Sequence, residues 1–311
     1  MNKGDTLTYD VERESPKRFR LFTSHVFDFV FFTLIAFLLN FALSPLLGMV
    51  PASKEASLFQ EQIQLESQLY VKDGEVVKNI AEYFESKNLP MNEESDELDD
   101  ALTYFFTLYI KEETKDSGEL YLKFKTEAKT KDGSPLFDEK GERALENADY
   151  DSDYLSFYRE LASDKAPGYL SVKPEYLAAR RTLIIMQIVS IACSITLSYL
   201  VFYIAIPLIF HRGKQTFGFK INGLYLLFVD GMSPKLGRFL LFALFRYAFF
   251  FLLAIPFVLI PYFVSITMMI IRKEKQTLSE YLFGFYCVKA KKEEIYESKE
   301  ELVKREGKQE N

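Results

Sequence analysis

The sequence contains no tryptophan, and only two cysteines and two histidines occur among its 311 residues. Two cysteines cannot form a disulfide framework, and two histidines cannot build a histidine-rich metal site. The chain also lacks the CxxC, HExxH, GxSxG and GxxxxGK[ST] motifs. Those motifs supply redox, metallopeptidase, hydrolase and nucleotide chemistry. We therefore expect neither an enzyme nor a cofactor, and we expect no nucleic-acid partner.

Charge is missing from three long runs, Phe29–Ser53, Thr182–Phe210 and Tyr247–Ile271. A helix needs about 20 mostly apolar residues to cross the hydrocarbon core of a bilayer, and each run is long enough. The sequence therefore predicts an all-α integral membrane protein with three or four transmembrane helices in contact with the lipid bilayer. The alternatives are three buried helices of a soluble protein, and a cleaved signal peptide in place of the first span.

The remaining charge is distributed unevenly. Residues 51–179 carry 15 Lys and Arg against 29 Asp and Glu, a net charge of −14, whereas the rest of the chain carries 23 against 15, a net charge of +8. Basic residues lie immediately before the first span, so the positive-inside rule places the N-terminus in the cytoplasm. We expect a multi-pass protein of a bacterial plasma membrane. Its expected parts are a leader (1–21), a first span (22–50), an acidic, mostly helical extracytoplasmic insertion (51–180), a membrane region (181–289) and a charged tail (290–311).

Local patterns predict the elements between the spans. In the insertion, apolar periodicity predicts helices, with Ser95 as the N-cap of one of them. We find no internal repeat. The expected elements are helices containing Leu58–Leu69, Val77–Phe84, Leu102–Tyr109 and Leu145–Leu161, a short strand over Tyr121–Thr126, and a second strand over Leu224–Val229 that ends in the turn Asp230–Gly231.

Two interpretations stay open for the region Leu236–Ile271. As a single span it would place the basic residues after Ile271 outside the cell, against the positive-inside rule. A helical hairpin broken near Pro256 keeps both ends in the cytoplasm, and it is the interpretation that we favour.

Several ionisable residues fall within or beside these spans. Asp28 lies about two turns into the first span, and His25 lies one turn before it. Charged side chains are costly in a membrane and face a partner or a water-filled cavity. Asp28 and His25 are therefore candidates for a proton relay or a cation site. The alternative is a structural ion pair between Asp28 and Arg20 or Arg246 that fixes the helix register.

Two further patterns have simple structural readings. Ser190, Ser194 and Ser198 form a stripe of small residues at helical spacing, which favours helix packing over a pore lining. Four acidic residues match the spacing of a calcium-binding loop, but Tyr154 stands where that loop needs glycine. We expect no metal site from these four residues, which are Asp149, Asp151, Asp153 and Glu160.

The membrane region resembles the RDD family of bacterial membrane proteins, which is named for one arginine and two aspartates. The chain opens with Arg18 and Arg20 before a span and Asp28 within it, as that family does. The similarity covers residues 15–50 and 182–289 and leaves the acidic insertion outside. Its other matching segments are Gln215-Thr216-Phe217-Gly218, Val229-Asp230-Gly231, Leu236-Gly237-Arg238 with Arg246 beyond it, and Gln276-Thr277-Leu278-Ser279-Glu280.

The resemblance implies a transport role such as exchange of an inorganic cation for a proton. Asp28 and Glu280 would be the titrating or ion-binding acids, with Glu280 and Ser279 standing where the family has aspartate and histidine. The counter-charges would be Arg20, Arg238 and Arg246. Few spans make a thin transport path, so we expect a homo-oligomer. The alternative function is a non-transporting scaffold or sensor whose acidic ectodomain binds a partner at the cell envelope.

Overall fold

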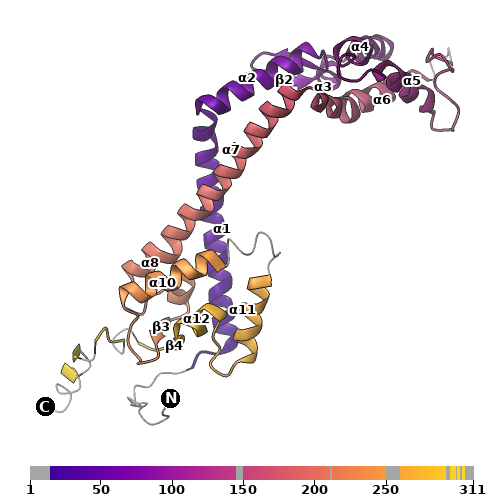
Figure 1. The fold of residues 1–311 in the computed structure, drawn as a ribbon. Helices are drawn as coiled ribbons and strands as arrows, with labels where there is room; N and C mark the ends of the chain where they lie inside the picture. Colours follow the sequence, from indigo (N-terminus) through magenta and orange to yellow (C-terminus); the bar gives the residue numbers. More distant parts are fainter. Residues whose placement is uncertain are drawn as a thin grey trace. The chain divides into compact units, whose positions relative to one another are not determined.

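The structure is a computed structural model that describes residues 15–144, 150–210, 212–249, 260–291, 295–298, 300–301 and 303–304. The chain divides into two compact units (Figure 1). Unit 1 comprises residues 1–43 and 190–311, and unit 2 comprises residues 44–189. Each unit has its own hydrophobic core.

Two helical segments are long and apolar enough to cross a membrane. They are α1 (Arg18–Gly48) and Pro174–Ile209, which joins α7 (Pro174–Tyr199), the π-helical turn Leu200–Ala205 and α8 (Ile206–Ile209). Only 11% and 28% of their most apolar windows are buried. The core helix of a soluble protein would be covered on most sides, and exposed apolar surface of this kind is typical of helices that contact lipid. We expected three or four such helices, and the described residues contain two.

Helix α1 is an integral part of unit 1. Leu21, Ser24, Asp28 and Phe32 are buried on one of its faces. Leu21 packs into the core around the strands described below, and Phe32 packs with aromatic residues of the second segment. These contacts argue against a signal peptide that is removed.

The serine stripe of α7 packs against α1. Ser190 donates a hydrogen bond to the Asn40 side chain at 2.9 Å, and Ser198 donates to the Phe32 carbonyl oxygen at 3.0 Å. Ser194 donates to a carbonyl oxygen of its own helix. All three side chains are buried, as expected for small residues that let two helices approach closely.

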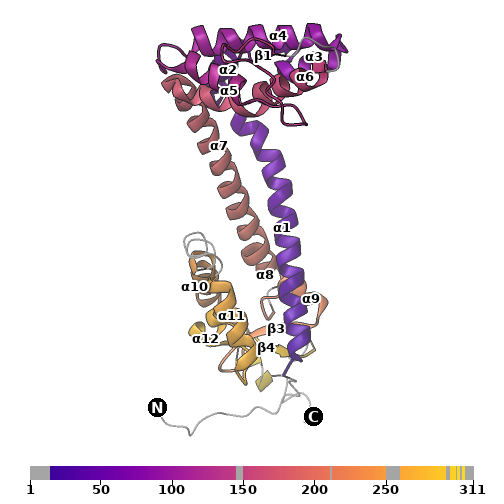
Figure 2. The same ribbon diagram turned by 90° about the vertical axis from the view of Figure 1, so that its right-hand side faces the viewer.

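The rest of unit 1 combines short helices with one small sheet (Figure 2). Strands β3 (Leu224–Phe228) and β4 (Phe285–Lys289) pair antiparallel, with Leu226 opposite Cys287. The sequence predicted β3 but not β4. The helices of this part are α9 (Phe217–Ile221), α10 (Leu236–Tyr247), α11 (Ile260–Ile271) and α12 (Leu278–Phe283).

Helices α10 and α11 both contact α12. On one straight helix their middles would lie roughly 36 Å apart, because a helix rises about 1.5 Å per residue, and the six residues of α12 span only about 9 Å. The described helices α10 and α11 therefore do not form one straight helix, and residues 250–259 between them lie outside the described residues.

Unit 1 contains an internal repeat, contrary to our expectation from the sequence. The first half is α1 followed by α7, α8, α9 and β3, and the second half is α10 followed by α11, α12 and β4. Thr216 and Thr277 cap α9 and α12 in the same way. Gln215 donates to the Leu224 carbonyl oxygen at 2.7 Å, and Gln276 makes the equivalent bond to Phe285 at 2.6 Å.

The backbone and the sheet follow the same two-fold relation. Lys214 and Lys275 both have positive φ angles, of 43° and 54°. Because Leu226 pairs with Cys287, its own equivalent, the β3–β4 register has a local two-fold axis. In the sequence, residues 15–36 and 233–254 share Ser15/Ser233, Pro16/Pro234, Lys17/Lys235, Arg20/Arg238, Phe27/Phe245, Phe31/Phe249, Phe32/Phe250, Leu34/Leu252 and Ala36/Ala254.

Unit 2 is mostly helical and has one aromatic-rich core. Helices α4 and α6 contact each other, and β1 and β2 form an antiparallel hairpin. Its elements are α2 (Pro51–Glu66), β1 (Tyr70–Asp73), β2 (Val76–Asn79), α3 (Ile80–Lys87), α4 (Met91–Tyr104), the π-helical turn Phe105–Tyr109, α5 (Ser117–Glu127), α6 (Asp151–Glu160), the π-helical turn Leu161–Lys165 and the 3₁₀-helix Ala166–Val172.

Several local predictions in unit 2 are wrong. Tyr121–Thr126 lies in α5 instead of a strand, because Tyr121 and Phe124 face the core with helical spacing. Ser95 lies inside α4 and donates to the Met91 carbonyl oxygen, so it is not an N-cap. Val77 belongs to β2. The helix expected over Leu145–Leu161 begins at Asp151, and residues 145–149 lie outside the described residues.

One carboxylate connects three helices of unit 2. Asp99 on α4 accepts hydrogen bonds from Tyr121 at 2.5 Å and Tyr158 at 3.0 Å, and Lys125 lies 2.8 Å from its Oδ1. Burial raises the pKa of Asp99, but the hydrogen bonds and charge of Lys125 and the two tyrosines outweigh it and hold that pKa below its ordinary value.

The Asp99→Asn variant tests this network. We expect it to lose about 1–3 kcal/mol of stability in unit 2, because hydrogen bonds to a charged acceptor are replaced by weaker ones. The Asp99 carboxylate stabilises the folded state fully above its unfolded-state pKa of about 3.9, and this stabilisation is lost as pH falls through the lower folded-state pKa. Thermal unfolding from pH 7 to pH 3 should show a shallower decline in the variant.

Asp100→Asn is the matched control, because Asp100 is the exposed neighbour on the same helix. Equal losses in the two variants would contradict a stabilising role of the Asp99 network.

Candidate functional site

The most deeply buried acid of unit 1 is Asp28, whose side chain has no solvent exposure. Its Oδ2 accepts a hydrogen bond from the Thr216 hydroxyl at 2.6 Å, and its Oδ1 accepts one from the Gly218 backbone N–H at 2.7 Å. Helix α1 therefore holds α9 through one carboxylate. The sequence left two roles open for Asp28, a proton relay or cation site and a structural ion pair with Arg20 or Arg246. In the structure neither arginine is hydrogen-bonded to Asp28, whose partners are Thr216 and Gly218 instead.

Gly218 makes this contact possible. A Cβ atom at this position would collide with the Ser24 carbonyl oxygen and lie 2.9 Å from Oδ1 of Asp28. The two backbones can approach this closely because Gly218 has no side chain. The sequence analysis singled out Gly218 only as part of a resemblance, because nothing local reveals a partner on another helix.

His25 lies one turn before Asp28, and the two side chains have different surroundings. The His25 ring packs edge-to-face against Phe219 with centroids 5.5 Å apart. Its Nε2 atom is buried and has no hydrogen-bond partner among the described residues. A buried imidazole nitrogen normally finds a partner, so this atom is available to a ligand or a water molecule.

Arg246 on α10 is the central cation of unit 1. It is half-buried, its guanidinium lies 4.7 Å from the centre of the Tyr203 ring, and its charge interacts with those of Asp28 and Glu280. Arg246 lines two neighbouring cavities, a small one of about 20 Å³ and a large one of about 470 Å³. Its five N–H donors allow it to serve both cavities.

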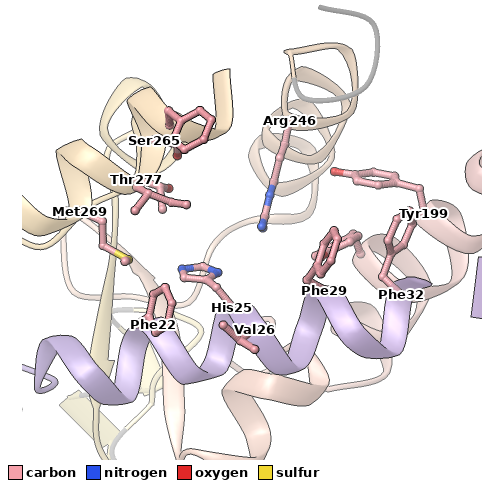
Figure 3. Close-up of a pocket in the computed structure, with 13 residues that line it drawn as sticks. Phe22, His25, Val26, Phe29, Phe32, Tyr199, Arg246, Ser265, Met269 and Thr277 are labelled. Atoms are coloured by element: carbon pink, nitrogen blue, oxygen red, sulfur yellow. The ribbon is translucent and has the colours of Figure 1, made fainter. Parts of the chain in front are cut away.

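The large cavity is mainly apolar (Figure 3). Arg246 reaches from α10 toward α1, His25 projects from α1 toward it, and Thr277 lies at the start of α12. Its volume falls within the range of about 300–1,000 Å³ that is typical of small-molecule sites, which are apolar with a few polar groups. The other lining residues are Phe22, Val26, Phe29, Phe32, Tyr199, Tyr203, Phe263, Ser265, Ile266 and Met269.

Glu280 lines the small cavity together with Arg246, Lys214 and Thr216. Its Oε2 accepts a hydrogen bond from the Thr277 backbone N–H at 2.7 Å, and this bond completes the capping box of α12. Its Oε1 lies 3.5 Å from the Cys287 sulfur, which donates to it. Burial is the main cause that raises the pKa of the Cys287 thiol.

The other candidate residues lie apart from this cluster. Arg238 is exposed, and its guanidinium lies 4.2 Å from the centre of the Phe228 ring. Arg20 is half-buried, and its carbonyl oxygen accepts a hydrogen bond from Ser24. Neither residue lines the cavities around Arg246.

The calcium-type spacing does not form a loop in the described part of the chain. Asp151 and Asp153 lie in the first turn of α6, and Glu160 is its last residue. Asp149 lies outside the described residues. Within the described ranges, no group of three or more His, Cys, Asp and Glu side chains is placed to hold a metal ion.

The Gly218→Ala variant tests the close contact between α1 and α9. We expect it to destabilise unit 1 by about 1–3 kcal/mol, because the added methyl group forces the backbones apart. Gly237→Ala on α10 is the control: a Cβ atom there meets nothing within 4 Å, so its effect should be neutral or stabilising. Thermal unfolding followed by circular dichroism in detergent checks both. A Gly218→Ala protein as stable as Gly237→Ala would contradict the contact.

Comparison with known proteins adds no family to this description, since no family model, no curated protein and no solved structure matches the chain. The resemblance to the RDD family stays a prediction from the residues, and the functional argument rests on the chemistry of the site.

Proposed function

We propose that the chain is an RDD-like, multi-pass plasma-membrane protein with a transport role, in which Asp28 takes up and releases a proton. The observation that carries the proposal is a fully buried carboxylate that holds α9 in place while His25 and Arg246, beside it, line a large cavity. Buried ionisable groups within membrane spans are costly, and they are most often retained for ion or substrate movement.

Protonation of Asp28 would change its contact with α9. The ionised carboxylate accepts hydrogen bonds from Thr216 and Gly218. A protonated carboxyl group has lost one charge and gained a donor, so both bonds weaken. Because α9 leads directly into β3, a change at Asp28 reaches the sheet that joins the two halves of unit 1. Proton binding and release at Asp28 could thereby switch the cavity between two conformations.

A proton is the cation that we favour. A metal ion would need several oxygen ligands around it, and the described residues offer no group of three acidic or other ligating side chains. Asp28 and Glu280 would each serve as proton acceptors, with Arg246 as their shared counter-charge.

The repeat supports four membrane-crossing elements with both termini in the cytoplasm. Lys275, just after α11, donates to the Ser15 hydroxyl at 3.0 Å and to the Pro16 carbonyl oxygen at 2.7 Å, just before α1. This contact supports a topology in which the start of α1 and the end of α11 lie on the same side of the membrane. In this topology α10 and α11 form the hairpin, and residues 51–180 lie outside the cell. A homo-oligomer would complete the transport path.

A second candidate function assigns the activity to unit 2, as a scaffold or sensor for an envelope partner. Unit 2 has its own core of more than a dozen buried residues, including the fully buried Leu98, Leu102 and Phe105. It also has an open cleft of about 410 Å³ whose lining carries both acidic and basic side chains, among them Glu127, Lys131 and Asp153.

Proton flux in proteoliposomes tests the leading proposal. Asp28→Asn keeps the shape of the side chain and one acceptor but removes its titration, so proton flux should fall at least tenfold. Asp230→Asn is the control, because Asp230 is an exposed acid in the turn after β3. Proton flux in Asp28→Asn equal to that of the control would sink the proposal.

Removing residues 55–172 separates the two candidates. If transport resides in unit 1, we expect the shortened chain to keep most of the flux, because both halves of the repeat remain. No flux in the full chain, together with a cellular defect when these residues are removed, would transfer the function to unit 2.

A further inference from the structure

The two halves of unit 1 differ at one decisive position. The aligned sequences of α1 and α10 place Arg246 at the equivalent of Asp28. Thr216 and Thr277 are also equivalent, as caps of α9 and α12. In the first half the capping threonine donates to a carboxylate from the facing helix. In the second half the facing helix has an arginine, which cannot accept a hydrogen bond.

This exchange is accompanied by a change in packing. In the first half, Ser24 and Gly218 are small, and α1 lies directly on α9. Their equivalents in the second half, Phe242 and Ser279, carry larger side chains, and Phe242 packs against Phe283 and Phe285. Thr277 and Arg246 both line the large cavity, whereas Asp28 does not. In the first half the capping threonine thus donates to an internal carboxylate, whereas in the second half the arginine and the capping threonine line the cavity.

From this broken symmetry we infer that the large cavity binds the carboxylate of an amphiphile, with its head group between Arg246, His25 and Thr277 and its apolar chain against the aromatic wall. In the first half the equivalent capping threonine, Thr216, donates to the carboxylate of Asp28, which indicates that a carboxylate also suits Thr277. The guanidinium of Arg246 is a fork that matches a carboxylate. His25 adds a buried Nε2 atom that has no hydrogen-bond partner among the described residues and can donate to an anion.

The apolar part of the ligand follows from the remaining lining. Phe22, Val26, Phe29, Ile266 and Met269 provide hydrocarbon surface. Phe22, Phe29 and Phe263 are also partly exposed at the surface of unit 1, the surface that faces lipid in the proposed topology. A single-chain fatty acid already dissolved in the bilayer would have both the head group and the body that this cavity fits.

The absence of tryptophan provides a direct test, because one introduced tryptophan is the sole indole emitter. Ile266→Trp places it in the cavity lining, and Ile191→Trp places it on the exposed surface of α7 outside the cavity. Full-length protein in nanodiscs is titrated with 9,10-dibromostearic acid, which quenches tryptophan on contact. We expect saturable quenching of the Ile266→Trp protein at a mole fraction at least tenfold lower than that needed to quench the Ile191→Trp protein.

Arg246→Gln in the Ile266→Trp protein should weaken this quenching at least tenfold, whereas Arg238→Gln, on the same helix but outside the cavity, should leave it unchanged. Quenching that survives Arg246→Gln in folded protein would overturn the inference. If Arg246→Gln does not fold, the Ile266→Trp protein alone is titrated with 9,10-dibromooctadecanol, an uncharged alcohol. Quenching by the alcohol equal to that by the acid would also overturn the inference. Brominated phosphatidylglycerol that quenches as strongly would assign the cavity to a lipid phosphate and overturn the single-chain carboxylate.

Discussion

The arrangement of unit 1 depends on one carboxylate that is buried between two helices. An ion in an apolar interior is tolerated only when nearby donors replace its water, and Asp28 receives such donors from Thr216 and Gly218. Those donors can reach it because Gly218 and Ser24 let the α1 and α9 backbones meet. Helix α9 then continues into β3, which pairs with β4 of the second half. The contact at Asp28 therefore helps to determine where the sheet lies, and with it the second half of the repeat.

The second half uses the same construction with the charge reversed. Arg246 takes the place of Asp28, and Glu280 takes the place of Phe219. A carboxylate can be satisfied by a threonine hydroxyl and a backbone N–H, but a guanidinium has only donors and needs acceptors instead. Glu280 supplies negative charge on the side of the small cavity. Arg246 also lines the large cavity, so the residue that breaks the symmetry of the repeat is part of the candidate site.

The sequence predicted the features that depend on local composition. Charge-free runs identified α1 and the α7–α8 segment, and a short apolar run followed by Asp230–Gly231 identified β3. Contacts between distant residues could not be predicted, because Asp28 and Gly218 lie 190 positions apart. The repeat was missed because the insertion of unit 2 separates α1 from α7, so the two pairs of equivalent segments have different spacings. In Tyr121–Thr126 the alternation matched both a strand and a helix, and packing against the core decided for the helix.

The position of the insertion separates the two units in physical terms. Unit 2 enters between α1 and α7, at the place where the second half has only the connection between α10 and α11. Lengthening a connection costs little free energy, since the entropy of closing a loop grows only with the logarithm of its length. The hydrogen bonds at Asp28, the β3–β4 pairing and the lining of the large cavity all come from residues of unit 1. The residues of the cavity and those of unit 2 belong to separate units, so each set can change without altering the other.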